Sequence, residues 1–447
     1  MPAMAAVNAA SRSNRRRVVG VAVAAAVALS TGTSFLAQKA PVTDALTTAK
    51  TVTLAGSRAM PAAQPVVSPV AGGGVSMTAG WAAAAATCVA MGGAKRGASS
   101  VAMSAEAAAA AAPAKPKKIR IEAFDSIRFF LIAYIVCGHF GSFAAPSNFA
   151  MKAITQINVV VGAFFVLSGY VAAYTTTENG ESKPDPRLTG TPAAKWILQR
   201  VFGYYPLHLL VALIFAPMFL YPDVLFSGWP TAIGHMVMSL TMTQAWFPMH
   251  AEVWNAPTWF LSALTFAMAI MYYVLPVIAR QTKDQLRRTL GITFLVGLLP
   301  KLAYCYDHNA WGFLEGAMSP KALPIAIFNT QRFNPFYALI ELMLGAIACR
   351  LVMLDGAEGE KAPKTNVMST LAPLVGMVGI VLLRAFDVIH LSDMLTRALI
   401  FIPLFIRFLM ASHRNSVSKV KDAVLSVLSS KIFTTLGGLA FPIFVVH

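Results

Sequence analysis

Long apolar runs alternate with short polar segments from Phe124 to His447. Most of these runs approach the roughly 20 apolar residues that an α-helix needs to cross a bilayer. The pattern predicts an all-α fold, a polytopic transmembrane helical bundle of about nine to ten spans, preceded by a disordered targeting leader. The predicted spans are 124–144, 153–174, 203–221, 257–279, 289–304, 335–354, 368–384, 395–411 and 432–447.

Composition excludes a soluble globular protein. The 447 residues are 57% hydrophobic and 12% charged, with a mean hydropathy of +0.62, whereas globular domains average about 25% charged residues. The net charge is +17, of which residues 1–120 contribute +11, from 13 Lys/Arg against Asp44 and Glu106. No basic stripe interleaved with aromatic residues is present, so nucleic-acid binding is not expected. The four cysteines lack CxxC spacing, so neither a disulfide framework nor a metal site is predicted.

Residues 1–114 are rich in Ala, Ser, Val and Gly and nearly free of acidic residues. A basic cluster around Arg15 precedes an apolar run at 18–29, as in the n- and h-regions of a signal sequence. A low-acid stretch with a cleavage-like VAMSA at 101–105 follows, which is typical of a transit peptide. This order resembles the bipartite plastid leaders of algae with complex plastids. We expect a targeting leader and linker, disordered or cleaved, and a plastid membrane as its destination. The alternatives are another endomembrane, the plasma membrane, or a disordered tail with one weak N-terminal span.

Residues 115–447 are expected to form one transmembrane domain. No soluble catalytic domain is appended, so any chemistry is expected within the membrane core. The last apolar run, 432–447, is short for a span at a rise of about 1.5 Å per residue, and the sequence stops inside it. We therefore expect the chain or its gene model to be truncated at the C-terminus.

One shorter apolar stretch, 231–247, carries His235, Gln244 and several hydroxyl side chains. If it does not cross the membrane, one side receives loops with 19 Lys/Arg and the other side only six. Cytoplasmic loops carry the excess of Lys and Arg, and a crossing would move the basic loop 280–288 to the opposite side. The stretch is therefore predicted to be re-entrant or interfacial. The start of the domain is predicted to face the cytoplasm, or the equivalent inner side of a plastid.

The first predicted span carries two side chains that are costly at lipid depth, Arg128 and His139. Their separation of eleven residues is close to three full helical turns, so both lie on one face of the helix, about 16 Å apart along its axis. Asp125 lies one turn before Arg128 and can pair with it. Two interpretations are open: a functional site, or an Asp–Arg pair that anchors the helix end together with a histidine satisfied by a neighbouring helix.

Ordered segments across about 120–447 resemble the acyltransferase-3 family, the membrane-bound O-acyltransferases of the bacterial O-antigen and exopolysaccharide acetylase type. Arg128 and His139 have the family's Arg-x10-His spacing, within DSIR at 125–128. Further similar segments are GAFFVLSGY at 162–170, KWILQRVFGYYPLHLL at 195–210, PTWFLS at 257–262, 334–345 and 436–447. The chain departs from the pattern at 263–265, Ala-Leu-Thr where many members have an acidic pair, and at Gly203, where a second basic residue often stands. No one branch of the family therefore indicates the acceptor.

The resemblance implies transfer of an acyl group, commonly acetyl, from an acyl-CoA co-substrate to a hydroxyl of a carbohydrate, glycolipid or similar acceptor at the lipid bilayer, without a bound cofactor. His139 is the expected general base or transient acyl carrier, and Arg128 the second catalytic residue. Arginine suits bidentate contacts to the phosphates of the donor. The expected donor- or substrate-binding residues are Asp125, Lys195, Arg200, Ser168, Trp259, Glu341 and His447. Trp259 has a second interpretation as an interfacial anchor.

Two other classes of protein remain open. A multi-span transporter or flippase also has many spans, intramembrane charges and proline-broken helices, although the sequence shows no internal repeat with paired broken segments. A non-catalytic family member that acts as a membrane scaffold is the third possibility. The histidines without a matching motif are interpreted as loop or packing residues: His208, His235, His250, His308, His390 and His413.

Overall fold

The computed structural model describes the chain from residue 118 onward, in the ranges 118–144, 149–178, 183–312, 325–357 and 366–447. The predicted targeting leader, 1–114, lies outside the described residues. Within these ranges all regular elements are helices apart from an isolated bridge between Thr177 and Pro184. The prediction of an all-α fold is confirmed.

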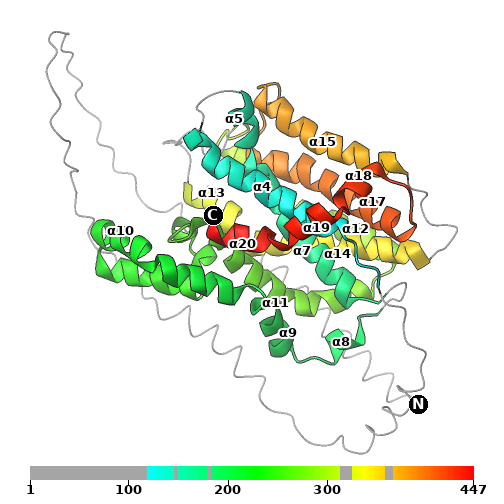
Figure 1. The fold of residues 1–447 in the computed structure, drawn as a ribbon, viewed down its shortest axis with the longest axis horizontal. Coiled ribbons are helices and arrows are strands. Elements are labelled where there is room, and N and C mark those ends of the chain that lie inside the picture. Colours follow the sequence, from blue (N-terminus) through cyan, green and yellow to red (C-terminus); the bar gives the residue numbers. More distant parts are fainter. Residues whose placement is uncertain (1–117, 145–148, 179–182, 313–324, 358–365) are drawn as a thin grey trace, which may run out of the picture. The chain divides into compact units, whose positions relative to one another are not determined.

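Figure 1 shows these helices packed into a bundle, with α10 extending from it on the left of the view. The helices are α4 (Ala123–Ala144), α5 (Phe149–Ile154), α6 (Ile157–Val160), α7 (Gly162–Thr176), α8 (Pro186–Thr189), α9 (Ala193–Val201), α10 (Tyr205–Leu240), η1 (Gln244–Trp246), η2 (Pro248–His250), η3 (Ala256–Thr258), α11 (Trp259–Ala279), α12 (Lys283–Asp307), α13 (Ile325–Phe333), α14 (Pro335–Ala357), α15 (Val367–Ala385), α16 (Asp393–Leu395), η5 (Thr396–Phe401), α17 (Ile402–Val417), α18 (Ala423–Leu428), α19 (Lys431–Gly438) and α20 (Ala440–Val446).

Seven helices of the described part are long and apolar enough to cross a membrane. They are Ala123–Gly141, Tyr205–Leu240, Ala256–Ala279, Lys283–Asp307, Ile325–Gly356, Val367–Ala385 and Asp393–Val417. The predicted span 153–174 is instead a pair of helices, Met151–Val160 and Gly162–Thr176, bent by 43°, which makes eight spans if the pair crosses as one. The predicted count of nine to ten is therefore not confirmed, and two regions account for the difference.

The first region is α10, which turns back on itself at Gly228. The φ of 79° and ψ of 161° at this residue are open to glycine but strained for other residues. The turn brings the two ends of the helix together, because the Tyr205 hydroxyl donates to the Leu240 carbonyl at 3.0 Å and His208 Nε2–H donates to the Ser239 carbonyl at 3.0 Å. What reads in the sequence as two apolar stretches is therefore one helical hairpin.

This hairpin contains the predicted span 203–221 and most of the stretch 231–247. Its second arm returns beside the first and places Leu240 next to Tyr205; the re-entrant course of 231–247 stays a prediction. Large apolar side chains cover its outer surface, with Leu213 57%, Phe226 82% and Trp229 60% exposed. Such a surface suits contact with lipid.

The second region is the C-terminal run 432–447, which is two short helices, α19 and α20, rather than one span. Both pack along α4. The chain breaks directly after Gly437 and Gly438, and glycine is a poor helix former. Gly437 also lies so close to α4 that an added Cβ would fall 2.4 Å from the Asp125 carbonyl. Close packing on α4 thus replaces the extended helix that the hydropathy predicts.

The centre of the bundle is the parallel pair α7 and α14. Gly169 lies against the carbonyl of Leu342 and Gly345 against that of Val166, and a Cβ added at either glycine would sit 1.9 Å from the facing oxygen. Small residues permit this approach between membrane helices. Helices α11, α12 and α17 pack on α14 around this contact.

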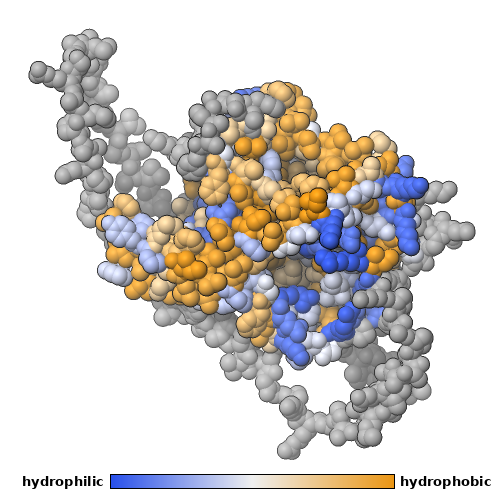
Figure 2. All heavy atoms as spheres, in the orientation of Figure 1, coloured by the Kyte–Doolittle hydropathy of each residue, from blue (hydrophilic) through white to orange (hydrophobic). Residues whose placement is uncertain are grey.

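Helix α4 runs antiparallel to α7, since Phe124 contacts Tyr170 while Gly138 lies beside Ile157, just before α7 begins. The start of α4 and the ends of α7 and α14 therefore share one end of the bundle, which we call the basic end. Figure 2 shows hydrophilic side chains gathered there, near α9 and α19, while apolar side chains cover much of the remaining visible face. This distribution, with polar side chains gathered at one end of an otherwise apolar surface, is typical of a membrane protein.

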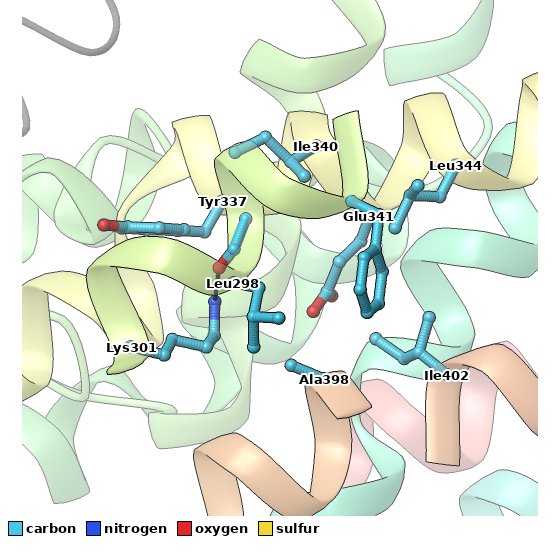
Figure 3. A pocket seen from close by; sticks show the side chains of 10 residues that line it. Leu298, Lys301, Tyr337, Ile340, Glu341, Leu344, Ala398 and Ile402 are labelled. Carbon is cyan, nitrogen blue, oxygen red and sulfur yellow. Dashed lines mark hydrogen bonds between the residues drawn. The ribbon is translucent and has the colours of Figure 1, made fainter. Parts of the chain in front are cut away.

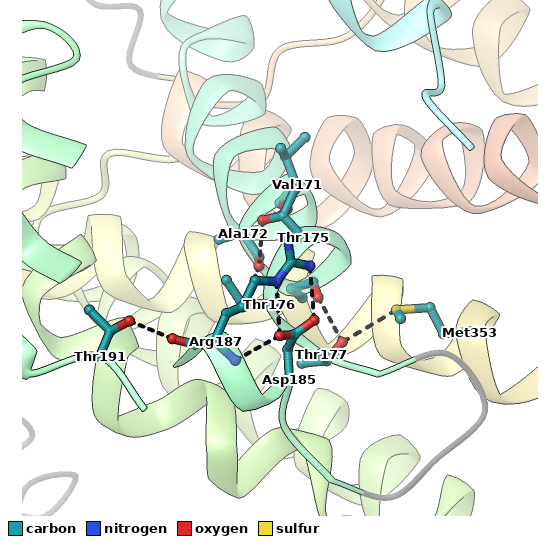
Figure 4. Close-up of polar contacts among 10 residues, drawn as sticks. Val171, Ala172, Thr175, Thr176, Thr177, Asp185, Arg187, Thr191 and Met353 are labelled. Atoms are coloured by element: carbon teal, nitrogen blue, oxygen red, sulfur yellow. Dashed lines mark hydrogen bonds and ion pairs between the residues drawn. The ribbon is translucent and has the colours of Figure 1, made fainter. Parts of the chain in front are cut away.

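Ion pairs and backbone contacts close the basic end. Asp355 pairs with Lys283 and Arg414, each at 2.5 Å. Asp185 joins α7 to α8: its backbone N–H donates to the Thr176 carbonyl at 2.9 Å, and its carboxylate accepts from the Arg187 backbone N–H at 2.8 Å and from the Arg187 guanidinium at 2.9 Å and 3.0 Å (Figure 4). These contacts fix the chain between the membrane helices.

Candidate functional site

The predicted ion pair at the start of α4 is present. Arg128 Nη1 lies 2.6 Å from Asp125 Oδ1, and Arg120 Nη2 lies 2.7 Å from Asp125 Oδ2. One carboxylate is therefore shared by two guanidinium groups, and Glu122 is a second carboxylate within electrostatic range of Arg120. The Arg128 side chain is 35% exposed, so an anionic ligand can reach it. The ion pair with Asp125 orients the Arg128 guanidinium.

His139 lies near the other end of α4, where it stacks on His447. The two rings are 12° from parallel with centroids 5.2 Å apart, and His447 Nε2 lies 3.2 Å from His139 Nδ1. Arg332 is within electrostatic range of His139. Both histidines are predicted site residues, and the fold brings them together across 308 positions of sequence.

A backbone carbonyl sets the direction of the hydrogen bonds in this pair. His447 Nδ1 lies 2.8 Å from the carbonyl of Phe444, which can only accept, so His447 Nδ1 carries a proton. In the neutral ring, His447 Nε2 is then the acceptor and takes the N–H of His139 Nδ1. His139 Nε2 is left with its lone pair, and its side chain is exposed. This is the arrangement of a general base.

Lys195 and Arg200 lie on α9, which packs on α11. Lys195 is exposed. The Arg200 guanidinium lies 3.3 Å from the centroid of the Trp196 ring, and burial lowers the pKa of Arg200 to about 10, which leaves it charged at neutral pH. Among the described residues no contact joins either side chain to Arg128. They form a second cationic group instead of one cluster with Arg128.

Ser168 and Trp259 belong to the packed interior. Ser168 is half-buried on α7, and its hydroxyl has no hydrogen bond to a described residue. Trp259 begins α11 and is only 7% exposed, with its ring centroid 6.3 Å from that of Phe165 and 4.9 Å from that of Phe333. This burial contradicts the interpretation of Trp259 as an interfacial anchor.

Glu341 lies on α14 and is held by Arg397 through two hydrogen bonds, one of them 2.9 Å from Nε to Oε1. Arg397 lies on η5, a π-helical turn, and such turns are frequent at functional sites. Glu341 also lines a pocket together with Lys301 of α12 (Figure 3). Glu341 therefore has two cationic neighbours, Lys301 and Arg397, which the sequence analysis did not name as site residues.

The sequence analysis also missed a second histidine pair. His235 Nδ1 lies 3.1 Å from Asp223 Oδ2, and His235 Nε2 lies 2.9 Å from His250 Nδ1. The Trp254 indole N–H donates to the same carboxylate at 3.1 Å. Because a carboxylate only accepts, His235 donates to Asp223 and His250 donates to His235, which leaves the His250 Nε2 lone pair free. Burial, followed by the field of His235, lowers the pKa of His250.

The sequence contained a signal for two of these missed residues but not for the other three. Lys301 and Arg397 are cations within apolar runs, and such charges are functional candidates by default. Asp223, His235 and His250 have no linear signature, since they meet only after the hairpin has formed. In the described part of the chain, no group of three or more His, Cys, Asp or Glu side chains is arranged to hold a metal ion.

Comparison with known proteins identifies the family. The family model Acyl_transf_3, described as an acyltransferase domain, matches residues 121–447. Searches of curated proteins and of solved structures found no match. The matched range contains every predicted site residue, from Asp125 to His447, and all of the described helices. The chain belongs to the acyltransferase-3 family, and it is a membrane acyltransferase by family and by its apolar helices.

Proposed function

We propose that the protein is an O-acyltransferase that moves an acyl group, acetyl in the first instance, from an acyl-CoA to a hydroxyl of a carbohydrate or glycolipid acceptor. The observation that carries the proposal is the stacked pair of His139 and His447, which leaves one basic nitrogen exposed on a membrane helix. Family membership supports acyl transfer as the reaction class.

In the proposed reaction, His139 Nε2 takes the proton of the acceptor hydroxyl while the oxygen attacks the thioester carbonyl. The carbon–sulfur bond then breaks, and the imidazolium returns the proton to the leaving thiolate, so His139 ends neutral. His447 accepts the His139 Nδ1–H bond throughout and stabilises the imidazolium, as the orienting member of a catalytic triad does. General base catalysis of this kind contributes about 10²–10⁴-fold.

A covalent route uses the same nitrogen. His139 Nε2 attacks the thioester, the thiolate leaves, and the acyl-imidazole is then attacked by the acceptor hydroxyl. In both routes the His447 contact fixes which nitrogen reacts. The two routes differ in whether an acyl-enzyme accumulates when the acceptor is omitted.

The cations of the basic end are proposed to bind the phosphates of the donor. Arg128 is oriented by Asp125, and Arg200 by stacking on Trp196. An acyl-CoA carries its thioester at the end of a long, thin arm. Phosphates held near Arg128 and a thioester near His139, about 16 Å along α4, suit such a donor.

The proposed location is a plastid membrane, on the strength of the leader pattern at 1–114. Fusion of residues 1–114 to a fluorescent protein in an alga with complex plastids should direct the fluorescence to the plastid. Fluorescence in the cytosol or the plasma membrane would refute the proposed location. It would leave the proposed acyl-transfer activity unaffected.

The proposed activity is tested in membranes from cells that express the full chain. The membranes receive labelled acetyl-CoA, and label in lipids and glycans is counted. His139→Ala and Arg128→Ala should abolish incorporation at equal protein level. His390→Ala, which removes an exposed loop histidine, is the matched control and should leave incorporation unchanged. Wild-type incorporation by His139→Ala, or none by the wild type with acetyl- or longer acyl-CoA, would contradict the proposal.

A further inference from the structure

The loop between η2 and η3 contacts α20 through the side chain of Asn255. The Asn255 Nδ2–H donates to the Val445 carbonyl at 2.8 Å, across 190 positions of sequence. A carbonyl only accepts, so the amide nitrogen of Asn255 faces it. Val445 is fully buried and lies two residues before His447, which stacks on His139. The Asn255 amide therefore binds the short helix that leads into His447.

Two neighbouring side chains attach this loop to other helices. Trp254 stacks on Phe219 of α10 with ring centroids 5.6 Å apart, and its indole N–H donates to Asp223 at 3.1 Å. Glu252 Oε1 lies 3.2 Å from Arg332 Nη2 of α13. The loop is therefore fixed to α10 and α13 by contacts of its own, and its position does not depend on α20.

The backbone of Trp254 is strained in a way that serves Asn255. Its φ of 60° is in the left-handed region, which is unfavourable for a bulky side chain and persists only where surrounding contacts impose it. A relaxed φ at Trp254 would redirect the next residue, Asn255, away from Val445. The contact with Asp223 therefore helps to keep the Asn255 amide on α20. Asp223 in turn accepts from His235, so the second histidine pair anchors the same loop.

The contact between His139 and His447 is sensitive to the position of α20. The two nitrogens are 3.2 Å apart, near the upper limit of a normal hydrogen bond, so a small shift of α20 breaks it. Helix α20 has seven residues, and a helix of this length is not stable without tertiary contacts. The orientation of His447 therefore depends on the contacts that hold α20.

We propose that Asn255 is a positioning residue, which holds α20 so that His447 accepts the hydrogen bond from His139 Nδ1. Asn255 acts through His447 and contacts neither substrate in the proposed reaction. Its effect on the reaction rate rests on the proposed acyl transfer, whereas its effect on the histidine pair does not.

The test uses Asn255→Asp, which keeps the shape of the side chain but replaces the N–H donor by an acceptor. The full chain, labelled with nitrogen-15 in its histidine rings, is reconstituted in lipid nanodiscs at a pH of about 8, where an ordinary histidine is neutral. Solid-state NMR then reports which ring nitrogens carry a proton, and His139→Gln identifies the His139 signals. The wild type should show one His139 tautomer, with Nδ1 protonated and Nε2 bare. Asn255→Asp should show both tautomers, because the Nδ1–H has lost its fixed acceptor.

Acetyl transfer is the second readout. Asn255→Asp should lower kcat about tenfold, as expected for the loss of one hydrogen bond, with little change in KM because the amide contacts no substrate. Trp254→Phe keeps an aromatic ring but removes the donor to Asp223, so it should also mix the His139 tautomers and lower kcat by a smaller factor. Asn366→Asp is the matched control: the oxygen at this position caps α15, which Asp does equally well, so both readouts should match the wild type.

A single His139 tautomer in Asn255→Asp would overturn the proposal, as would a wild-type kcat in that variant. If Asn255→Asp does not fold, the same two outcomes in Trp254→Phe overturn it. The NMR readout needs no turnover. If the wild type transfers no acetyl group, the proposed function fails, and the tautomers of His139 in the two variants still decide whether Asn255 positions His447.

Discussion

The substitution Gly169→Ala probes the contact that sets the spacing of the central helices. A Cβ built at Gly169 falls 1.9 Å from the Leu342 carbonyl oxygen, whereas ordinary contacts begin at 3.4 Å. Helices α7 and α14 would have to separate locally by about 1.5 Å, the difference between these two distances. The obstacle is backbone, which cannot rotate away as a side chain does. We therefore expect a loss near or above the upper end of the usual overpacking cost, about 3 kcal/mol.

The loss is measured as the free energy of unfolding of the purified protein in mixed micelles, from SDS titration followed by Trp fluorescence. Gly379→Ala is the matched control: it also lies in a helix, α15, but nothing lies within 4 Å of the added Cβ. That substitution should stabilise the protein by up to about 1 kcal/mol, because Ala has the higher helix propensity. Equal effects of the two substitutions would refute the close approach of α7 and α14.

Three further predictions concern charges. The pKa of His250 in the folded protein lies below its usual value, so the unfolded chain binds more protons below about pH 6.5; the unfolding free energy should therefore fall as the pH drops from 7.5 to 5, and less steeply in His250→Gln. Arg384→Met should cost about 3–5 kcal/mol in the same unfolding assay, because it leaves Asp393 buried without its guanidinium; the double variant with Asp393→Leu should recover most of this, and no recovery would contradict a buried-charge effect. Asp125→Asn should raise the KM for acetyl-CoA about tenfold with a smaller change in kcat, whereas an unchanged KM would remove Arg128 from donor binding.

The sequence predicts local features of the site well. Asp125 and Arg128 are one turn apart on a single helix, so their ion pair follows from helix periodicity. The separation of Arg128 from His139 follows in the same way. The resemblance to the family identified both His139 and His447 as site residues. Their stacking depends on how α20 packs along α4, and so does the contact of the Phe444 carbonyl that fixes which nitrogen of His447 carries a proton. Helix periodicity cannot predict a contact between His139 and His447, because they are 308 positions apart in the sequence.

Other features depend on tertiary structure that hydropathy does not encode. An apolar run looks the same whether it crosses a bilayer or folds back, so the turn at Gly228 converts two predicted stretches into one hairpin. The same limitation produced a span at 432–447, where close packing at Gly437 favours two short helices. Partners such as Arg397 for Glu341 come from separate helices and become visible only once these have packed.

The hydrogen bond that His139 donates to His447 is the central claim, and the rate of acetyl transfer by His447→Gln tests it most directly. Gln keeps polar atoms at this position but cannot reproduce the fixed imidazole acceptor for His139 Nδ1–H. With saturating acetyl-CoA, we predict that kcat falls by about tenfold to a hundredfold at unchanged protein level, with little change in KM. A wild-type kcat in His447→Gln would show that His139 does not act through His447 and would contradict the account.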